Sequence, residues 1–251
     1  MMSLRFFERI GRYFYFLLRA IPASLGAFGR PVPLLVQLHT TLLGALPLGL
    51  VTGLALGIVV WIHMHGVLPP QYERLLPQYL ALAVVVEFAP LSAGLIVAGR
   101  MGASLGAELG SMRQTEQIDA LEVLGLSPVN RLVGPRVMAC VLTLPLLTII
   151  IAYDSILSSY LAEWMSGGLS WTQYKADCLR SLSLRLLLPA NLKTTVLGFL
   201  VGATGCYHGM HAKGGTEGVG RAATQGVVMS IFVVMVANVL LVQLIQILVP
   251  R

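Results

Sequence analysis

The chain has 251 residues, of which 56% are hydrophobic and 11% are charged. Soluble domains carry roughly 25% charged residues. A soluble protein of this length could not bury so much apolar surface, so the composition excludes a soluble globular protein. The formal net charge of +6 suits contact with anionic lipid headgroups, and no basic run with interleaved aromatic residues indicates nucleic-acid binding. We therefore expect a polytopic membrane protein.

The first 30 residues predict an amphipathic helix that lies in the membrane interface. At 3.6 residues per turn, arginines share one face and large apolar side chains fill the opposite face. The arginines are Arg5, Arg9, Arg12 and Arg19, and the apolar residues are Phe6, Phe7, Ile10, Tyr13, Phe14, Leu17, Leu18 and Ile21. The helix could be a plain anchor or could shape the entry of lipid. We divide the chain into this helix, residues 1–30, and a single transmembrane domain, residues 31–251.

Five segments are long and apolar enough to span a bilayer, because a spanning helix needs about 20 mostly apolar residues. They are residues 42–62, 79–99, 137–157, 190–207 and 227–249. The predicted fold class is an all-α membrane protein with about five transmembrane helices. Pro47 could kink the first helix or split off a re-entrant piece. Residues 158–189 predict one or two amphipathic helices at the outer surface.

Lysine and arginine are concentrated on one side of these spans. That side holds the N-terminal helix and the connections at 100–136 and 208–226. Short cytoplasmic loops carry an excess of positive charge. The bias therefore predicts a cytoplasmic N-terminus and places residues 100–136 in the cytoplasm.

A polar segment, residues 99–128, lies between the second and third predicted spans. Ser111-Met-Arg-Gln114 matches a capping box, which predicts a helix start, and Gly125 with Pro128 predicts its end. The residues that would line one side of this helix are Met112, Ile118, Leu121 and Leu124. A short apolar stripe with a polar surround suits a groove on another protein, although a solvated surface helix shows the same pattern.

Glycines recur at helical spacing in several of the spans. They are Gly49, Gly53 and Gly57, then Gly102 and Gly106, then Gly198 and Gly202. Small residues four apart let helix backbones approach closely. The pattern fits internal packing within one subunit, and it also fits a contact between two copies in a homodimer.

Three ionisable residues lie in or at the ends of apolar segments: Glu87, Asp154 and Lys193. A charge at the bilayer centre costs roughly 2.5–3.5 kcal/mol on insertion scales, so each must face protein, water or a partner. Lys193 could pair with Glu87, with Asp154 or with a lipid phosphate. A structural ion pair is the simplest interpretation, and an ion relay in a secondary transporter is an alternative.

The sequence offers no catalytic or metal-binding constellation. The histidines and Cys206 lack the spacing of a metal site, and no nucleophile elbow or paired-carboxylate motif occurs, which counts against an intramembrane enzyme acting on lipid headgroups. Gly209 to Thr216 has the length of a phosphate-binding loop but glycine where lysine is required. If ATP drives this protein, another chain must bind it.

Several motifs resemble the signature of the MlaE/YrbE family of ABC-transporter permeases. They read Glu87-Phe-Ala-Pro90, Ala98-Gly-Arg-Met-Gly102, Ala107-Glu-Leu-Gly-Ser-Met112, Thr115-Glu-Gln-Ile-Asp-Ala-Leu121 and Pro135-Arg136. A further block from Gly214 to Thr224 resembles the family's last cytoplasmic loop. The chain departs from the family pattern at Ala89, where glycine is usual, at Ser127, where aspartate is common, and at Asn238, where many members carry an acid.

The resemblance implies a lipid-transport role. Such permeases form a homodimer in the bacterial inner membrane, bind two cytoplasmic ABC ATPases and work with a periplasmic MCE-domain protein. The implied cargo is phospholipid or a related lipid that passes between the inner and outer membranes and supports outer-membrane lipid asymmetry. ATP and Mg would be held by the partner ATPase, with no cofactor on this chain.

The resemblance also implies roles for individual residues. The helix after the second span is a coupling helix that docks on the ATPase. The matched coupling positions are Glu108, Met112, Thr115, Glu116, Gln117, Asp119, Leu121 and Glu122. The polar residues in or beside the spans that we consider for a lipid site are Glu87, Arg100, Asp154, Lys193 and Asn238.

Overall fold

The computed structural model describes residues 2–69 and 74–248, and every regular element in these ranges is helical. The α-helices in this part of the chain are α1 (Met2–Gly26), α2 (Pro31–Val67), α3 (Leu76–Ala83), α4 (Ala89–Gln114), α5 (Gln117–Val123), α6 (Gly134–Met165), α7 (Trp171–Ser181), α8 (Leu184–Met210) and α9 (Gly215–Leu248). A 3-10 turn, η1 (Ala27–Gly29), follows α1. Two π-helical turns, η3 (Val84–Phe88) and η4 (Val129–Val133), run directly into α4 and α6. The predicted all-α class is confirmed.

Five helical stretches in the described residues are long and apolar enough to cross a membrane, as the sequence predicts. They are Pro31–Val67, Leu76–Gln114, Val129–Met165, Leu184–Met210 and Gly215–Leu248. Each is longer than its predicted span, because hydropathy marks only the apolar middle of a helix that continues through glycine and charged residues. The second stretch has 39 residues, about 58 Å of helix against a hydrocarbon core of about 30 Å. Pro47 lies inside α2, which stays one continuous helix.

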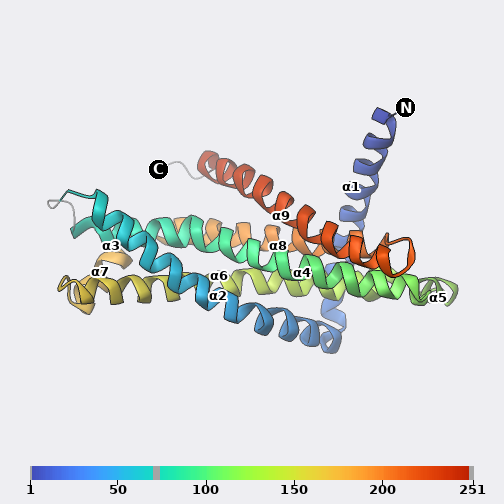
Figure 1. Cartoon of the computed structure of the whole chain (residues 1–251), viewed down its shortest axis with the longest axis horizontal. Helices are drawn as coiled ribbons and strands as arrows, with labels where there is room; N and C mark the ends of the chain where they lie inside the picture. Colours follow the sequence, from blue (N-terminus) through green and yellow to red (C-terminus); the bar gives the residue numbers. More distant parts are fainter. Residues whose placement is uncertain (1, 70–73, 249–251) are drawn as a thin grey trace.

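The long helices lie side by side, with α1 and α5 at one end and α3 and α7 at the other (Figure 1). Helix α2 packs along α6, α6 along α8, and α4 along α8 and α9. Helix α7 is the single amphipathic helix found within residues 158–189, because α6 continues to Met165. Helix α7 packs on α3. The hydroxyl of its buried Tyr174 lies at a hydrogen-bonding distance of 2.8 Å from the Ser159 hydroxyl of α6.

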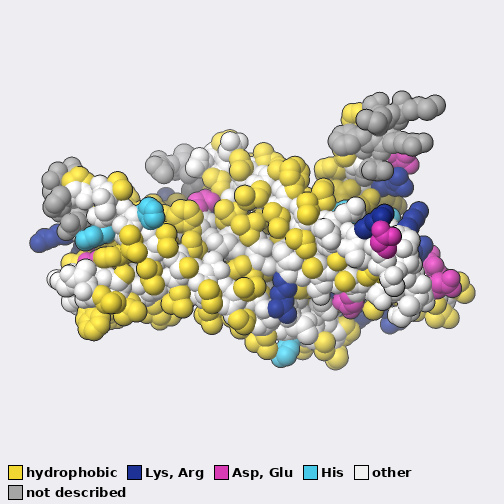
Figure 2. Space-filling model, in the orientation of Figure 1, with side chains coloured by type: hydrophobic (Ala, Val, Ile, Leu, Met, Phe, Trp, Pro, Cys, Tyr) yellow, Lys and Arg dark blue, Asp and Glu magenta, His cyan; other side chains and the backbone are white. Residues whose placement is uncertain are grey.

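The outer surface of the bundle is apolar over the spans. Figure 2 shows hydrophobic side chains over most of the visible face, with acidic and basic side chains gathered at the end that carries α5. Helices α2 and α9 contribute many of the exposed apolar side chains, among them Leu48, Val51, Leu54, Phe232, Val239 and Leu240. This surface requires lipid or another protein around it.

Helix α1 joins the bundle through one side and leaves a second apolar side exposed. Phe16, Leu17 and Ala20 are buried, and the Tyr13 hydroxyl lies 2.6 Å from Thr204 Oγ1 of α8. Phe14, Leu18 and Ile21 are exposed, as are Arg12 and Arg19. The predicted apolar face of α1 therefore packs partly against the bundle and is partly left exposed. The side chains of Arg5, Phe6 and Arg9 lie outside the described residues.

The recurring glycines stand where two helices of this chain nearly touch. A Cβ on Gly106 would lie 2.7 Å from the Ala222 carbonyl oxygen, and one on Gly198 would lie 2.6 Å from that of Cys140. Gly102 faces Gly226, Gly202 faces Val137, and Gly49, Gly53 and Gly57 face Leu147, Asp154 and Ser155. These positions therefore close the α4–α9, α6–α8 and α2–α6 seams inside one subunit.

Candidate functional site

The start of the polar segment after the second span differs from the sequence prediction. Helix α4 continues without a break to Gln114, so Ser111 lies inside it and the predicted capping box is wrong. Ser111 does not begin a helix; its carbonyl accepts hydrogen bonds from the amide and hydroxyl of Thr115, each at 3.0 Å. The break comes at Glu116, whose φ of 58° places it in the left-handed region. The short helix α5 begins at the next residue.

The end of α5 follows the prediction. Gly125 has a φ of 72°, which glycine adopts without steric cost. Its amide donates to the Glu122 carbonyl at 3.0 Å, and the Leu126 amide donates to the Leu121 carbonyl at 2.9 Å. This is the Schellman arrangement, which satisfies the last carbonyls of a helix.

Helix α5 has an anchored side and an exposed tip. Ile118 is 1% exposed, and Asp119 forms an ion pair with Arg113 of α4. Val123 and Leu124 are 88% and 71% exposed. Leu121 is half-buried, whereas Thr115, Glu116, Gln117 and Glu122 are exposed. The predicted stripe is therefore split, with Ile118 facing the bundle and Leu124 facing away from it.

The end of α4 is also tied to the connection between α8 and α9. The Gln114 side-chain oxygen accepts a 3.1 Å hydrogen bond from the Gly215 amide. Gly214 and Gly215 have φ values of 99° and 66°, a conformation that L-residues with side chains rarely adopt. The two motif blocks of the sequence thus lie against each other in space.

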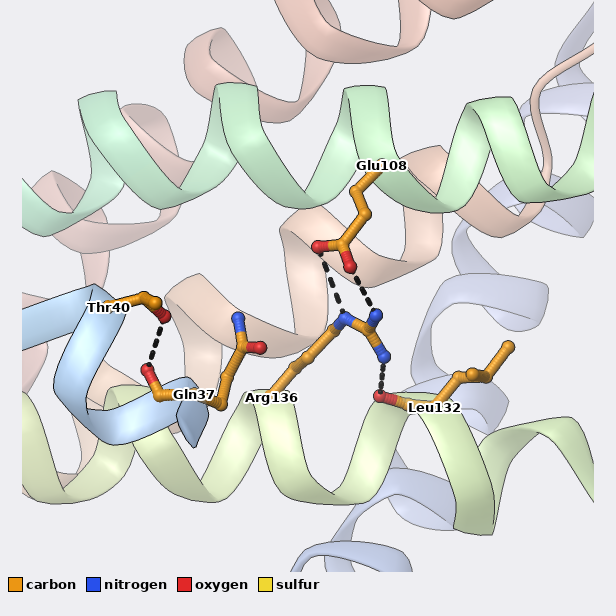
Figure 3. Close-up of polar contacts among 5 residues, drawn as sticks. All are labelled: Gln37, Thr40, Glu108, Leu132 and Arg136. Carbon is orange, nitrogen blue, oxygen red and sulfur yellow. Dashed lines mark hydrogen bonds and ion pairs between the residues drawn. The ribbon is translucent and has the colours of Figure 1, made fainter. Parts of the chain in front are cut away.

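Glu108 points into the protein, toward α6 (Figure 3). Its carboxylate accepts from Arg136 Nη2 at 2.5 Å and from Arg136 Nε at 3.5 Å. Arg136 Nη1 donates to the Leu132 carbonyl in η4 at 2.7 Å. Met112, one turn further along α4, packs half-buried against the core. Arg136 was part of the Pro135-Arg136 motif, but we did not predict it as a site residue, because its partner is 28 residues away.

Glu87 and Lys193 meet in the part of the bundle remote from α5, several turns inside the ends of their helical stretches. Lys193 Nζ lies 2.8 Å from Glu87 Oε2, and the lysine side chain is 1% exposed. Of the partners considered for Lys193, the structure selects Glu87. The pair borders a cavity of about 300 Å³ that is also lined by Arg185 and Gln246. Glu87 belongs to the π-helical turn η3, a local distortion that is frequent at functional sites.

The remaining polar candidates do not join this pair. Asp154 packs against Gly53 of α2, and one of its carboxylate oxygens is buried without a hydrogen-bond partner among the described residues. Asn238 lies buried on α9 with its side-chain oxygen likewise unpaired in that part of the chain. Arg100 donates to the Gly44 carbonyl of α2. The five candidates therefore form four separate sites on different helix seams, and only Glu87 and Lys193 share one.

The fold and these polar contacts define a polytopic helical membrane protein with ion pairs between its spans and a short exposed helix between the second and third spans. The family described as "Permease MlaE" matches residues 34–244. The chain therefore belongs to the MlaE permease family, whose members are transport components and not enzymes.

Named relatives agree with this assignment. A protein of Rickettsia typhi named "Probable ABC transporter permease protein" is 37% identical over 172 residues, which cover 68% of this chain and 66% of the relative. A Synechocystis protein of the same description is 33% identical, covering 63% of this chain and 60% of that protein. "Protein TRIGALACTOSYLDIACYLGLYCEROL 1, chloroplastic" of Arabidopsis thaliana is 37% identical, covering 64% of this chain and 46% of that protein. The matched region thus spans between 46% and 66% of the length of these three relatives.

Proposed function

We propose that this chain is the permease subunit of an ABC transporter that moves phospholipid or a related lipid between membranes, driven by a separate cytoplasmic ATPase. The observation that carries the proposal is the exposed tip of α5. Val123 and Leu124 are among the most exposed large apolar residues of the chain, yet the short helix that presents them is anchored by Ile118 and closed by a Schellman turn. A rigid apolar tip with an acidic surround is suited to insertion into a groove on another protein.

The length of the spans supports a location for this tip outside the bilayer. The α4 stretch exceeds the hydrocarbon core by about 28 Å of helix, and charged side chains occur at its α5 end. Filling a groove with Val123 and Leu124 would stabilise the complex by about 1.5–3 kcal/mol for each fully buried side chain. The surrounding carboxylates, Glu116 and Glu122, would favour a basic rim on the ATPase.

The cavity beside Glu87 and Lys193 supports lipid as the cargo. A buried lysine needs a negative partner, and the phosphate of a lipid could replace Glu87 in that role while Arg185 supplies a second cation. The Arabidopsis relative carries the name of a glycolipid, which supports a lipid cargo for this chain as well. In this scheme, ATP and lipid each favour different arrangements of the same helices, as any coupling between two sites requires.

The assembly and location follow the family's organisation in this proposal. Two copies would form a homodimer in the bacterial inner membrane, with the N-terminus and α5 in the cytoplasm and an MCE-domain protein on the periplasmic side. The apolar surfaces of α2 and α9 offer area for a second copy and for lipid. ATP and Mg would be bound by the ATPase.

The test is to express the chain with its ATPase and MCE protein, reconstitute the complex in phospholipid vesicles, and measure ATPase retention and ATP-dependent lipid transfer. We expect Val123→Asp with Leu124→Asp to release the ATPase. Val67→Asp is a matched control, because Val67 is 80% exposed and lies at the end of α2 remote from α5 (Figure 1). This substitution should have no effect on ATPase retention. Retention of the ATPase by the α5 double variant, with lipid transfer intact, would refute the docking role.

An ion-coupled transporter is the second candidate, favoured by the ion pair between the buried Lys193 and the partly exposed Glu87. This candidate predicts that lipid transfer occurs without any ATPase and that its rate follows an imposed proton gradient. The ABC proposal predicts no such transfer, so vesicles that contain the chain alone separate the two.

A further inference from the structure

The Glu108–Arg136 pair joins the two helices that flank α5. Glu108 lies less than two turns before the end of α4, and Arg136 lies in the first turn of α6. Arg136 is only 9% exposed, and its guanidinium makes two contacts with the carboxylate and one with the Leu132 carbonyl. Figure 3 shows the carboxylate reaching down from α4 to meet the guanidinium over α6.

The chemistry of this pair suits alignment better than stability. Arg136 is buried, whereas the Glu108 side chain is 41% exposed. Such a partly buried ion pair is weak support for stability, because desolvation of the charges offsets much of their attraction. A planar guanidinium that bonds a carboxylate through two of its nitrogens instead sets the distance and the angle between the groups. The third bond, to Leu132, fixes η4 relative to the same guanidinium. Two helices and the turn between them are therefore held in one arrangement.

The surrounding contacts connect this arrangement to α5. The Arg113–Asp119 ion pair holds α5 on the last turn of α4, and the Gln114–Gly215 hydrogen bond holds that turn to the start of α9. Residues 124–128, which connect α5 to η4, form no ion pair in the part of the chain that the structure describes. No such contact there would transmit a displacement of α5 directly to α6. The Glu108–Arg136 pair is a polar cross-link between α4 and α6 at this end of the bundle.

We propose that Glu108 and Arg136 are positioning residues, which make α4 and α6 move together when α5 is displaced. The inference rests on the proposed docking of an ATPase on α5. It assigns Glu108, whose side chain is 41% exposed, to a brace, the Glu108–Arg136 cross-link between α4 and α6, and not to the surface that contacts the ATPase. Loss of the brace leaves α5 able to bind its partner but unable to pass the displacement on to α6.

The first experiment compares Glu108→Gln with the wild-type complex. We expect ATPase retention to stay within about twofold, while lipid transferred per ATP hydrolysed falls between about twofold and thirtyfold, the range found for residues along a coupling path. Arg136→Lys should lower the lipid transferred per ATP hydrolysed by a similar factor, because an ammonium cannot make the three fixed contacts of the guanidinium. The reversed pair, Glu108→Arg with Arg136→Glu, should recover at least part of the transfer ratio.

The matched control is Glu217→Gln. Glu217 forms an exposed ion pair with Arg221 within α9, so this variant removes a carboxylate at the same end of the protein without uncoupling two helices. It should transfer lipid like the wild type. A Glu108→Gln complex that keeps its transfer ratio, or that loses the ATPase, would overturn the brace.

A second measurement does not need the ATPase. Spin labels at Ala120→Cys in α5 and Leu146→Cys in α6 report the distance between the two helices in the chain alone, in lipid nanodiscs, with the three native cysteines buried. The brace predicts a narrow distance distribution that broadens with Glu108→Gln and narrows again in the reversed pair. An unchanged width overturns the inference. A broadened width in a chain that binds no ATPase supports the brace and refutes the docking proposal, so the two failures are distinguishable.

Discussion

The Gly106 contact between α4 and α9 allows a sharp test of the packing. In Gly106→Ala the new Cβ would lie 2.7 Å from the Ala222 carbonyl oxygen and 2.8 Å from the Ala223 Cα. Ordinary contact begins at 3.4 Å, so the two backbones must separate by several tenths of an ångström. Because backbone cannot rotate away as a side chain can, α9 must shift as a unit.

The size of the effect follows from two opposing contributions. Replacing glycine by alanine inside a helix stabilises it by roughly 0.5–1 kcal/mol, whereas overpacking a close contact costs about 1–3 kcal/mol. The two ranges combine to a net loss of about 0–2.5 kcal/mol. Because both close contacts are to backbone atoms at under 3.0 Å, we expect Gly106→Ala to lose about 1–2 kcal/mol. For a chain of this size that loss lowers the melting temperature by roughly 2–8 °C.

Gly99 provides the matched control on the same helix. It belongs to α4, and nothing lies within 4 Å of an added Cβ. Gly99→Ala should therefore keep or raise the melting temperature. The assay is thermal unfolding of detergent-solubilised protein followed by size-exclusion chromatography. Equal melting temperatures for the two alanine variants would show that α4 and α9 do not approach as described.

Three further predictions concern the ion pair, a buried thiol and the end of α5. Lys193→Met should lower the melting temperature more than the double change with Glu87→Gln, because the single change leaves a carboxylate without its cation; an additive double variant would contradict the pairing. Burial raises the pKa of the Cys178 thiol to about 12, so little thiolate is present at pH 8 and maleimide should label Cys178 in the folded protein much more slowly than in the denatured chain. Equal labelling rates for Cys178 in the folded and denatured chains would refute this. Gly125→Ala should weaken hydrogen-exchange protection of the Leu126 amide, because a left-handed residue other than glycine costs about 1–2 kcal/mol, while Gly125→Asn should weaken it less; equal protection in all three proteins would exclude the Schellman turn as its source.

Helix α5 shows how far local sequence signals reach. Its end was predictable, because the demand for glycine at a positive φ is a property of one residue and its neighbours. Its start was not, because Ser111 sits in a helix that packs along α9 through Gly102 and Gly106. That packing carries α4 past the residues that match a capping box, and tertiary contact overrides the local signal.

The charged residues show the same division. The cost of a charge in an apolar span made it predictable that Lys193 needs a partner, but Glu87 and Asp154 were equally acceptable from the sequence. The structure pairs Lys193 with Glu87 across 106 residues of sequence and leaves Asp154 on the α2–α6 seam. Glu108 was placed among the coupling residues by its motif, and only the structure shows its carboxylate turned toward Arg136.

Composition, hydropathy and motif order by themselves determined the class of this protein, its five spans, the short helix between the second and third spans and its family. These properties depend on residue types along the chain, because partitioning between water and lipid and the local formation of helices are decided by short stretches of sequence. The tertiary structure determined which charges meet, which glycines touch which helix and which side of α5 faces outward. Such contacts depend on the distance and rotation between helices far apart in sequence, and no local pattern specifies either.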